Sequence, residues 1–110
     1  MITIKVIRNK EKNVVSFSVQ GHANADEAGK DIVCASISIL SQTIVLALDQ
    51  VGKIDVTYEM DEGWLLCQIP DNIDDIQRER ANIIIDTMII GIKGTSEMYP
   101  DYIKLQDEEV

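Results

Sequence analysis

The residues of this chain best suited to chemistry are one histidine and one thiol, joined by a short segment. His22 is the only histidine in the 110 residues, and eleven residues separate it from Cys34. Imidazole is a general base near neutral pH, and a thiolate is a strong nucleophile. Gly21 and Gly29 allow the backbone turns that would bring the two side chains together. The pair indicates a cysteine hydrolase.

The segment that carries the thiol has the pattern of a helix start. Asp31 is a favoured N-cap, because its carboxylate can accept backbone N–H groups of the first turn. Apolar residues follow it at steps of three and four: Val33, Ile37, Leu40, Ile44, Leu48 and Val51. We expect a helix from Asp31 to about Gly52, with Cys34 at its third position. The unpaired N–H groups and positive dipole end of a helix start would stabilise a thiolate there.

Ser38 and Ser41 lie on a different stripe of this helix from the apolar residues. This spacing predicts that the Cys34 sulfur lies on a polar, accessible face, with Ser38 one turn behind it. Two ordinary interpretations stay open, because a helical cysteine is often a small buried hydrophobe and a lone histidine is often only a surface residue. Cys67 alternates with Leu65 and Ile69, which predicts core packing for the second thiol.

No metal or cofactor is expected. A metal site built from His22, Cys34 and Asp31 is disfavoured, because the chain has no second histidine and no Cys-x-x-Cys pair. Thiol redox chemistry is disfavoured too, because no second cysteine lies near Cys34 in sequence.

The rest of the chain predicts two β-hairpins and two helices. The first hairpin has alternating strands at 2–8 and 14–20, and the second pairs 54–59 with 64–69 around the turn 60–63. The second helix follows possible caps at 71–75. Its expected inward residues are Ile76, Ile83, Ile84, Thr87, Met88 and Gly91 or Ile92.

Pro100 should stop the second helix, and 102–106 could then form a short terminal edge strand before an acidic tail. The order ββαββα(β) suits an α+β fold, in which two long helices cover one face of an antiparallel or mixed sheet. Nothing resembling a linker divides the chain, so residues 1–110 are expected to form a single domain.

Composition narrows the possible partners and location. The chain carries 19 acidic and 10 basic residues, a formal charge of −9, which disfavours nucleic-acid binding and favours a basic protein or peptide partner. The N-terminus lacks a signal-peptide pattern, and the apolar run around 83–92 is broken by Asp86 and Gly91. We expect a soluble cytoplasmic protein with reduced thiols and no membrane association.

One segment closely resembles a known family. Gly21-His22-Ala23, then Gly29-x-Asp31-Ile-Val-Cys34-Ala, and then Ser38 match the pattern of the ribosomal-processing cysteine proteases called Prp. The resemblance implies that Cys34 is the nucleophile, His22 the general base, and Asp31 and Ser38 supporting residues. It also implies a flexible loop bounded by Gly21 and Gly29. Many members have glycine where this chain has Asn24, but asparagine tolerates positive φ and the loop can still bend.

The resemblance further implies a substrate and an assembly. Members of the family remove an N-terminal extension from the large-subunit ribosomal protein numbered twenty-seven, and they resemble homodimers. The expected reaction is peptide hydrolysis through a thioester, with backbone N–H groups near the helix start stabilising the oxyanion. The competing hypothesis is a non-catalytic, ribosome-associated binding module.

Overall fold

The structure is a computed structural model that describes residues 1–21 and 28–110, with the side chains of 28–31 excepted. His22 and Asn24 therefore lie outside the described residues. The elements along the chain are β1 (Ile2–Arg8), β2 (Val14–Gly21), α1 (Ala28–Gln50), β3 (Thr57–Asp61), β4 (Trp64–Gln68), α2 (Asp75–Met98) and β5 (Ile103–Glu109). This order confirms the expected ββαββα(β) arrangement.

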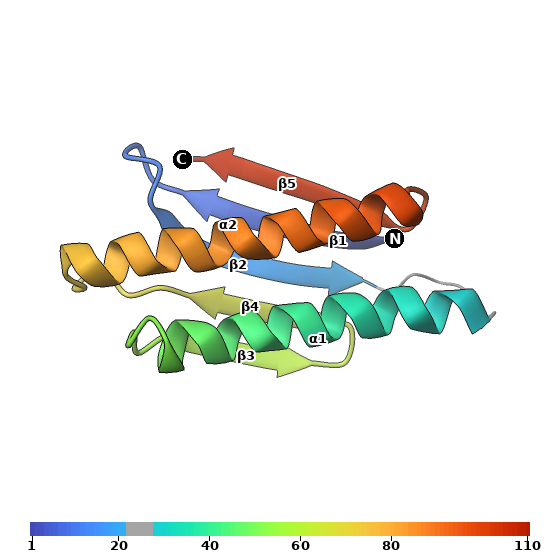
Figure 1. The fold of residues 1–110 in the computed structure, drawn as a ribbon, viewed down its shortest axis with the longest axis horizontal. Helices are drawn as coiled ribbons and strands as arrows, with labels where there is room; N and C mark the ends of the chain where they lie inside the picture. Colours follow the sequence, from blue (N-terminus) through green and yellow to red (C-terminus); the bar gives the residue numbers. More distant parts are fainter. Residues whose placement is uncertain (22–27) are drawn as a thin grey trace.

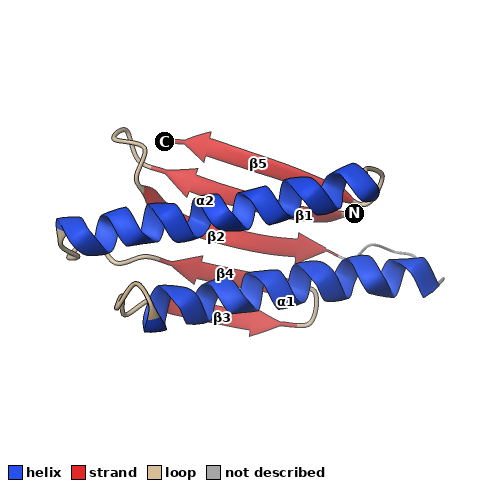
Figure 2. Cartoon of the chain, viewed as in Figure 1, coloured by secondary structure: helices blue, strands red, loops and turns tan. Residues whose placement is uncertain are grey.

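The five strands form one mixed sheet in the order β3-β4-β2-β1-β5. Neighbouring strands are antiparallel except β5, which runs parallel to β1 from the Ile2–Ile103 pair to the Arg8–Glu109 pair. Both helices lie on the same face of the sheet and run in opposite directions (Figures 1 and 2). The fold is therefore α+β, as the sequence predicts, with strands β3 and β5 at the two edges.

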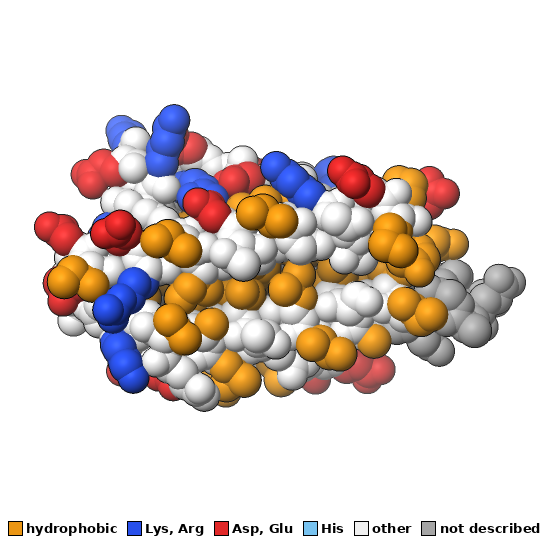
Figure 3. All heavy atoms as spheres, viewed as in Figure 1, with side chains coloured by type: hydrophobic (Ala, Val, Ile, Leu, Met, Phe, Trp, Pro, Cys, Tyr) orange, Lys and Arg blue, Asp and Glu red, His pale blue; other side chains and the backbone are white. Residues whose placement is uncertain are grey.

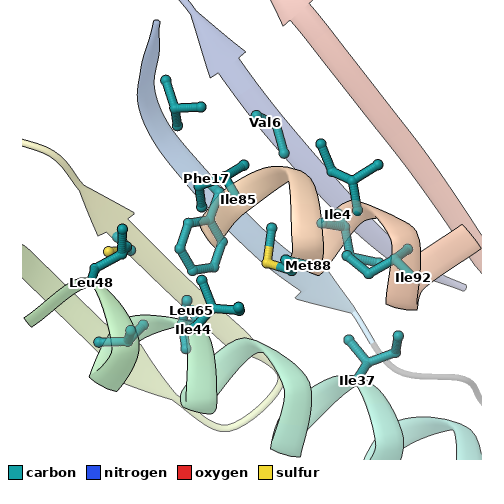
Figure 4. Close-up of a cluster of buried hydrophobic side chains, with 14 of the residues drawn as sticks. Ile4, Val6, Phe17, Ile37, Ile44, Leu48, Leu65, Ile85, Met88 and Ile92 are labelled. Carbon is teal, nitrogen blue, oxygen red and sulfur yellow. The ribbon is translucent and has the colours of Figure 1, made fainter. Parts of the chain in front are cut away.

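The core lies between the sheet and the two helices (Figure 4). Phe17 on β2 meets side chains from both helices there, and Cys67 is fully buried, which confirms its packing role. The helices approach closely at Gly91, where an added Cβ would lie 3.0 Å from a methyl carbon of Leu40. Apolar burial of this kind is the main stabilising term of such a domain.

The start of α1 differs from the prediction. The helix begins at Ala28, so Asp31 lies inside it and is not the N-cap, and Gly29 is also helical. Cys34 is then the seventh residue of the helix instead of the third. Interior glycine costs a helix only about 1 kcal/mol, which a helix of 23 residues tolerates. At the other end the helix stops at Gln50, so Val51 is 62% exposed instead of buried.

The second half of the chain differs from the prediction at β3 and agrees with it at the start of α2. Strand β3 begins at Thr57, and Ile54 is buried in the connection before it. Helix α2 has the expected kind of cap, since the Asp74 carboxylate accepts the backbone N–H of Gln77 at 2.8 Å and Gln77 caps in return. Its buried stripe is Ala81, Ile85, Met88, Ile89 and Ile92.

Three residues expected to face inward on α2 are exposed: Ile76, Ile83 and Thr87. The helix carries isoleucines on two faces, and their spacing alone does not show which face meets the sheet. Ile84, Met88 and Ile92 do pack as expected. The terminal strand is also longer than expected, because β5 extends through the acidic residues to Glu109.

Helix α1 is the most apolar part of the described chain. By length and composition the stretch Ile32–Gln50 could cross a membrane, with a mean hydropathy of 1.9. In the structure α1 lies on the sheet beside α2, and its residues Val33, Ile37, Ile44 and Leu48 belong to the core.

Candidate active site

A cavity of about 170 Å³ opens beside Cys34, between the first half of α1 and the end of the sheet where β2 ends and β4 begins. The cavity is lined by residues of α1, the end of β2 and the β3–β4 hairpin, with Ile2 of β1 beside them. Its lining residues are Ile2, Val19, Gly21, Cys34, Ile37, Ser38, Ser41, Gln42, Met60, Asp61, Gly63, Trp64 and Leu65. The thiol is therefore partly exposed in a pocket with mainly apolar walls, instead of packed away as a core residue.

Helix α1 supplies one wall. Cys34, Ser38 and Gln42 follow one another at intervals of four residues, so they lie above one another on one face of the helix. Ser38 is exposed, as predicted, and the Gln42 side-chain amide donates to its Oγ at 2.8 Å. Ser41 differs from its prediction: it is buried, and its hydroxyl donates to the carbonyl of Ile37 at 2.8 Å.

The end of β2 supplies the second wall. Gly21 has φ of +102°, and a Cβ at this position would collide with the carbonyl oxygen of Met1. Its N–H donates to the carbonyl of Gly63 at 2.9 Å. Only glycine can both adopt this positive φ and fit beside the Met1 carbonyl. The chain thus leaves the sheet at the cavity, one residue before His22.

The hairpin of β3 and β4 supplies the third wall. Met60 and Asp61 end β3, and Trp64 and Leu65 begin β4 on the other side of the turn. The Asp61 carboxylate accepts the backbone N–H of Glu62 at 2.7 Å, which holds the turn. The wall is apolar and aromatic apart from this one carboxylate.

A second, smaller cavity continues along α1. Its volume is about 110 Å³, and it is lined by Gln42, Val45, Leu46, Tyr58, Met60 and Leu65. Gln42, Met60 and Leu65 line both cavities. Together they make a groove that runs from Cys34 along the helix and beside β3.

The structure brings together some of the sequence-predicted site residues. Cys34, Ser38 and Gly21 line one cavity. Asp31 and Gly29 lie in the first two turns of α1, before Cys34. His22 and Asn24 fall outside the described residues, so their placement stays a prediction.

The helix-start argument for Cys34 is wrong. A residue seven positions into a helix has its backbone N–H paired within the helix, and the dipole effect falls off within the first turn. The backbone amide of Cys34 is therefore paired inside the helix, and Cys34 is not at the helix start that the sequence predicts.

The two thiols differ in environment. Cys67 is fully buried, and this burial raises the pKa of its thiol to about 12. It stays protonated at physiological pH and cannot serve as a nucleophile. Within 1–21 and 28–110, no group of three or more His, Cys, Asp or Glu side chains is placed to hold a metal ion.

Sequence reasoning missed four lining residues: Gln42, Met60, Asp61 and Trp64. Gln42 could have been found, since it is two helical turns after Cys34. The other three come from the β3–β4 hairpin. The sequence predicts this hairpin but does not show that it lies beside Cys34. Only the pairing of β4 with β2, which sets Trp64 opposite Gln20, carries this hairpin to the cavity.

Comparison with known proteins agrees with this geometry. Residues 1–104 match the family model described as cysteine protease Prp. The chain is 27% identical over 107 residues to the ribosomal processing cysteine protease Prp of Bacillus subtilis, which covers 96% of each protein. It is 30% identical over 108 residues to the protein of the same name from Staphylococcus aureus, which covers 96% of this chain and 97% of that one.

Comparison with a crystal structure indicates the same family. The ribosomal processing protease Prp of Staphylococcus aureus, in complex with a covalently linked product peptide, superposes with a TM-score of 0.83 at 28% identity. The match covers 98% of this chain and all of the other. The thiol-bearing cavity, the five-stranded α+β fold and the match over nearly the whole chain lead to one conclusion: this chain belongs to the Prp family of ribosomal-processing cysteine proteases.

Proposed function

We propose that this protein removes the N-terminal extension of the bacterial large-subunit ribosomal protein numbered twenty-seven, with Cys34 as nucleophile and His22 as general base. The observation that carries the proposal is the partly exposed Cys34 thiol in a cavity whose wall includes Gly21, the residue bonded to His22. A related protease with the same fold has been crystallised with a covalently linked product peptide.

The proposed reaction proceeds through a thioester. His22 takes the proton of Cys34, and the thiolate attacks the scissile carbonyl to form a tetrahedral intermediate. The carbon–nitrogen bond then breaks, His22 gives its proton to the leaving amine, and the acyl group stays on the sulfur. Water, deprotonated by His22, hydrolyses the thioester and restores the thiol. No metal or cofactor takes part in this scheme.

The groove beside Cys34 supports an extended peptide with apolar side chains before the cut. Its two cavities, of about 170 and 110 Å³, are large enough for apolar side chains and lie one after the other along α1. Trp64 in the first and Tyr58 in the second offer apolar ring faces. The net charge of −9 favours a basic ribosomal protein behind the extension and disfavours direct contact with nucleic acid.

We assign supporting roles to the other residues of the motif. Ser38 lies one helical turn from Cys34 in the same cavity and can donate a hydrogen bond to a bound peptide. Asp31, three residues before Cys34 in α1, is assigned a role in holding the site. Gly21, at the end of β2, and Asn24 are assigned to the segment that admits substrate.

The outer faces of the two helices support the homodimer that the family resemblance implies. Each helix carries a row of exposed apolar residues at intervals of seven. This outer stripe consists of Ile32, Ile39 and Leu46 on α1 and Ile76, Ile83 and Ile90 on α2. Figure 3 shows hydrophobic side chains gathered over both helices on this face. A two-fold axis would set the stripes of two copies against each other.

We place the enzyme in the cytoplasm, because the proposed substrate is a ribosomal protein and the reaction needs a reduced thiol. The test is incubation of the whole protein with a peptide that spans the extension and its junction, read by mass spectrometry. The expected result is one cut, present in the native protein and absent in Cys34→Ala and His22→Ala.

Cys67→Ala is the matched control, because it also removes a thiol but one that lies in the core, away from the groove. It should still cleave, once a thermal melt shows that it is folded. Cleavage retained in Cys34→Ala would overturn the mechanism. Tight binding of the peptide without any cleavage would favour the non-catalytic binding module.

A further inference from the structure

The Ser38 hydroxyl in the cavity has an unusual partner for a helical serine. Five other helical hydroxyls donate to the carbonyl oxygen four residues earlier. They are Ser36, Ser41, Thr43, Thr87 and Thr95. Ser38 instead accepts a hydrogen bond from Nε2 of Gln42 at 2.8 Å. Its oxygen is therefore held by a donor, while its own proton is not used in this bond.

This bond fixes the direction in which Ser38 can donate. A hydroxyl has one proton and two acceptor lone pairs, and here the Gln42 amide takes up one lone pair. The proton must then point away from Gln42, which lies one turn further along α1 in the same cavity wall. The side chain one turn back in the other direction is Cys34. The geometry thus allows the donor to point toward the sulfur end of the cavity.

A donor in that position matches what the proposed reaction needs. Residues four apart on a helix have Cβ atoms about 5–6 Å apart, so the Ser38 hydroxyl is a near neighbour of a carbonyl group attacked by the Cys34 sulfur. The backbone amides near Cys34 are already paired in the helix. The Ser38 hydroxyl is therefore a suitable donor to the oxyanion that forms when the thiolate attacks.

We propose that Gln42 is a positioning residue, whose amide N–H holds the Ser38 oxygen so that the Ser38 proton is presented to the oxyanion at Cys34. This inference rests on the proposed proteolytic function. It concerns a residue outside the Gly-His-Ala and Asp-Ile-Val-Cys-Ala motifs. It gives a side chain two helical turns from the nucleophile a role in catalysis.

The test exploits the polarity of the bond. In Gln42→Glu the carboxylate can only accept, so it would draw the Ser38 proton toward position 42 and away from Cys34. In Gln42→Lys the ammonium can only donate, so the native polarity is kept. Peptide cleavage is measured as kcat and KM for both variants. Gln50→Glu and Gln50→Lys are the matched controls, because Gln50 is an exposed glutamine on the same helix outside both cavities near Cys34.

We expect Gln42→Glu to lower kcat about tenfold or more, with KM changed less than about twofold, and Gln42→Lys to retain clearly more activity. Simple attraction of a basic substrate predicts the opposite order, because a new carboxylate would then help binding. In a Ser38→Ala background the difference between Glu and Lys at position 42 should disappear, since the two side chains act through one hydroxyl.

The possible outcomes distinguish failure of the proposed function from failure of this inference alone. A wild-type protein that cuts no peptide overturns the proposed function and this inference with it. A wild-type protein that cleaves, with Gln42→Glu equally active, overturns the inference alone. The same holds if the Glu–Lys difference persists without the Ser38 hydroxyl, because Gln42 would then act by lining the cavity and not by orienting Ser38.

Discussion

The backbone N–H of Gly21 donates to the carbonyl oxygen of Gly63 at 2.9 Å, and this bond ties the end of β2 to the turn between β3 and β4. Both residues line the cavity beside Cys34, and both have positive φ, +102° and +71°. Two glycine conformations therefore set where the chain leaves the sheet toward His22. The backbone geometry at this point therefore requires glycine as the first residue of the Gly-His-Ala motif. The sequence alone does not show this requirement.

Gly21→Ala should destabilise the fold by about 2 kcal/mol or more. An L-residue pays about 1–2 kcal/mol in the left-handed region, and the added methyl group would also collide with the Met1 carbonyl. Gly94→Ala is the control, because its added Cβ meets nothing within 4 Å and alanine favours a helix by about 1 kcal/mol. Urea unfolding should give opposite signs for the two variants. Equal losses would contradict this account of Gly21.

The two cysteines should be distinguishable by a thiol reagent. In the native protein Cys34 lines an open cavity, whereas Cys67 is fully buried with its pKa raised to about 12. We expect one fast equivalent of modification under native conditions and a second only after unfolding. Cys34→Ala should remove the fast phase and Cys67→Ala should keep it. A fast phase that survives in Cys34→Ala would show that Cys67 becomes exposed in the native ensemble.

Much of the fold could be predicted from the sequence because its signals are local. Alternation in 2–8 and 14–20 gives the first hairpin, and Asp74 with Gln77 marks a helix start by the chemistry of its cap. The parallel pairing of β5 with β1 could not be predicted, since it joins residues about a hundred positions apart. No local pattern carries that information.

The errors on the helices also have a physical cause. Helix α2 has isoleucines at 76, 83 and 90 on one face and a buried stripe on another, so periodicity alone does not say which face meets the sheet. In α1, the sequence predicts a loop at Gly29, yet the helix extends through it to Ala28. A glycine weakens a helix without ending it.

The site could be predicted in part for the same reasons. Cys34 and Ser38 share a helix face by spacing, which the sequence shows directly. The walls contributed by Trp64 and Met60 depend on how two hairpins pair, and the burial of Ser41 depends on how α1 is rotated on the sheet. Both features depend on tertiary packing and not on the local sequence. Tertiary packing determines the shape of the groove, whereas the motif determines only which reactive side chains it contains.

The buried thiol should make the protein less stable at alkaline pH. The pKa of Cys67 is raised from an ordinary 9.0 to about 12 by burial. Between these values the unfolded chain loses this proton while the folded chain keeps it, so stability is full below pH 9 and falls as the pH rises. One such group gives a slope of at most about 1.4 kcal/mol per pH unit. Urea midpoints from pH 8 to 10.5 should fall less steeply in Cys67→Ala than in the wild type. Parallel curves would contradict the prediction.

The outer stripe predicts a dimer that single charges can break. Ile39 and Ile83 are 68% and 58% exposed, so a lysine at either position leaves the core of the monomer intact. In a dimer joined through these helices, the same lysine would bury an unpaired charge twice, once for each copy. Sedimentation equilibrium should find the wild type dimeric and both Ile39→Lys and Ile83→Lys monomeric, with unchanged circular dichroism. Thr57→Lys, on the exposed strand β3, adds the same charge away from the stripe and should stay dimeric. A monomeric wild type would remove the dimer from the proposal, whereas dimeric variants would mean that two copies pair through another surface.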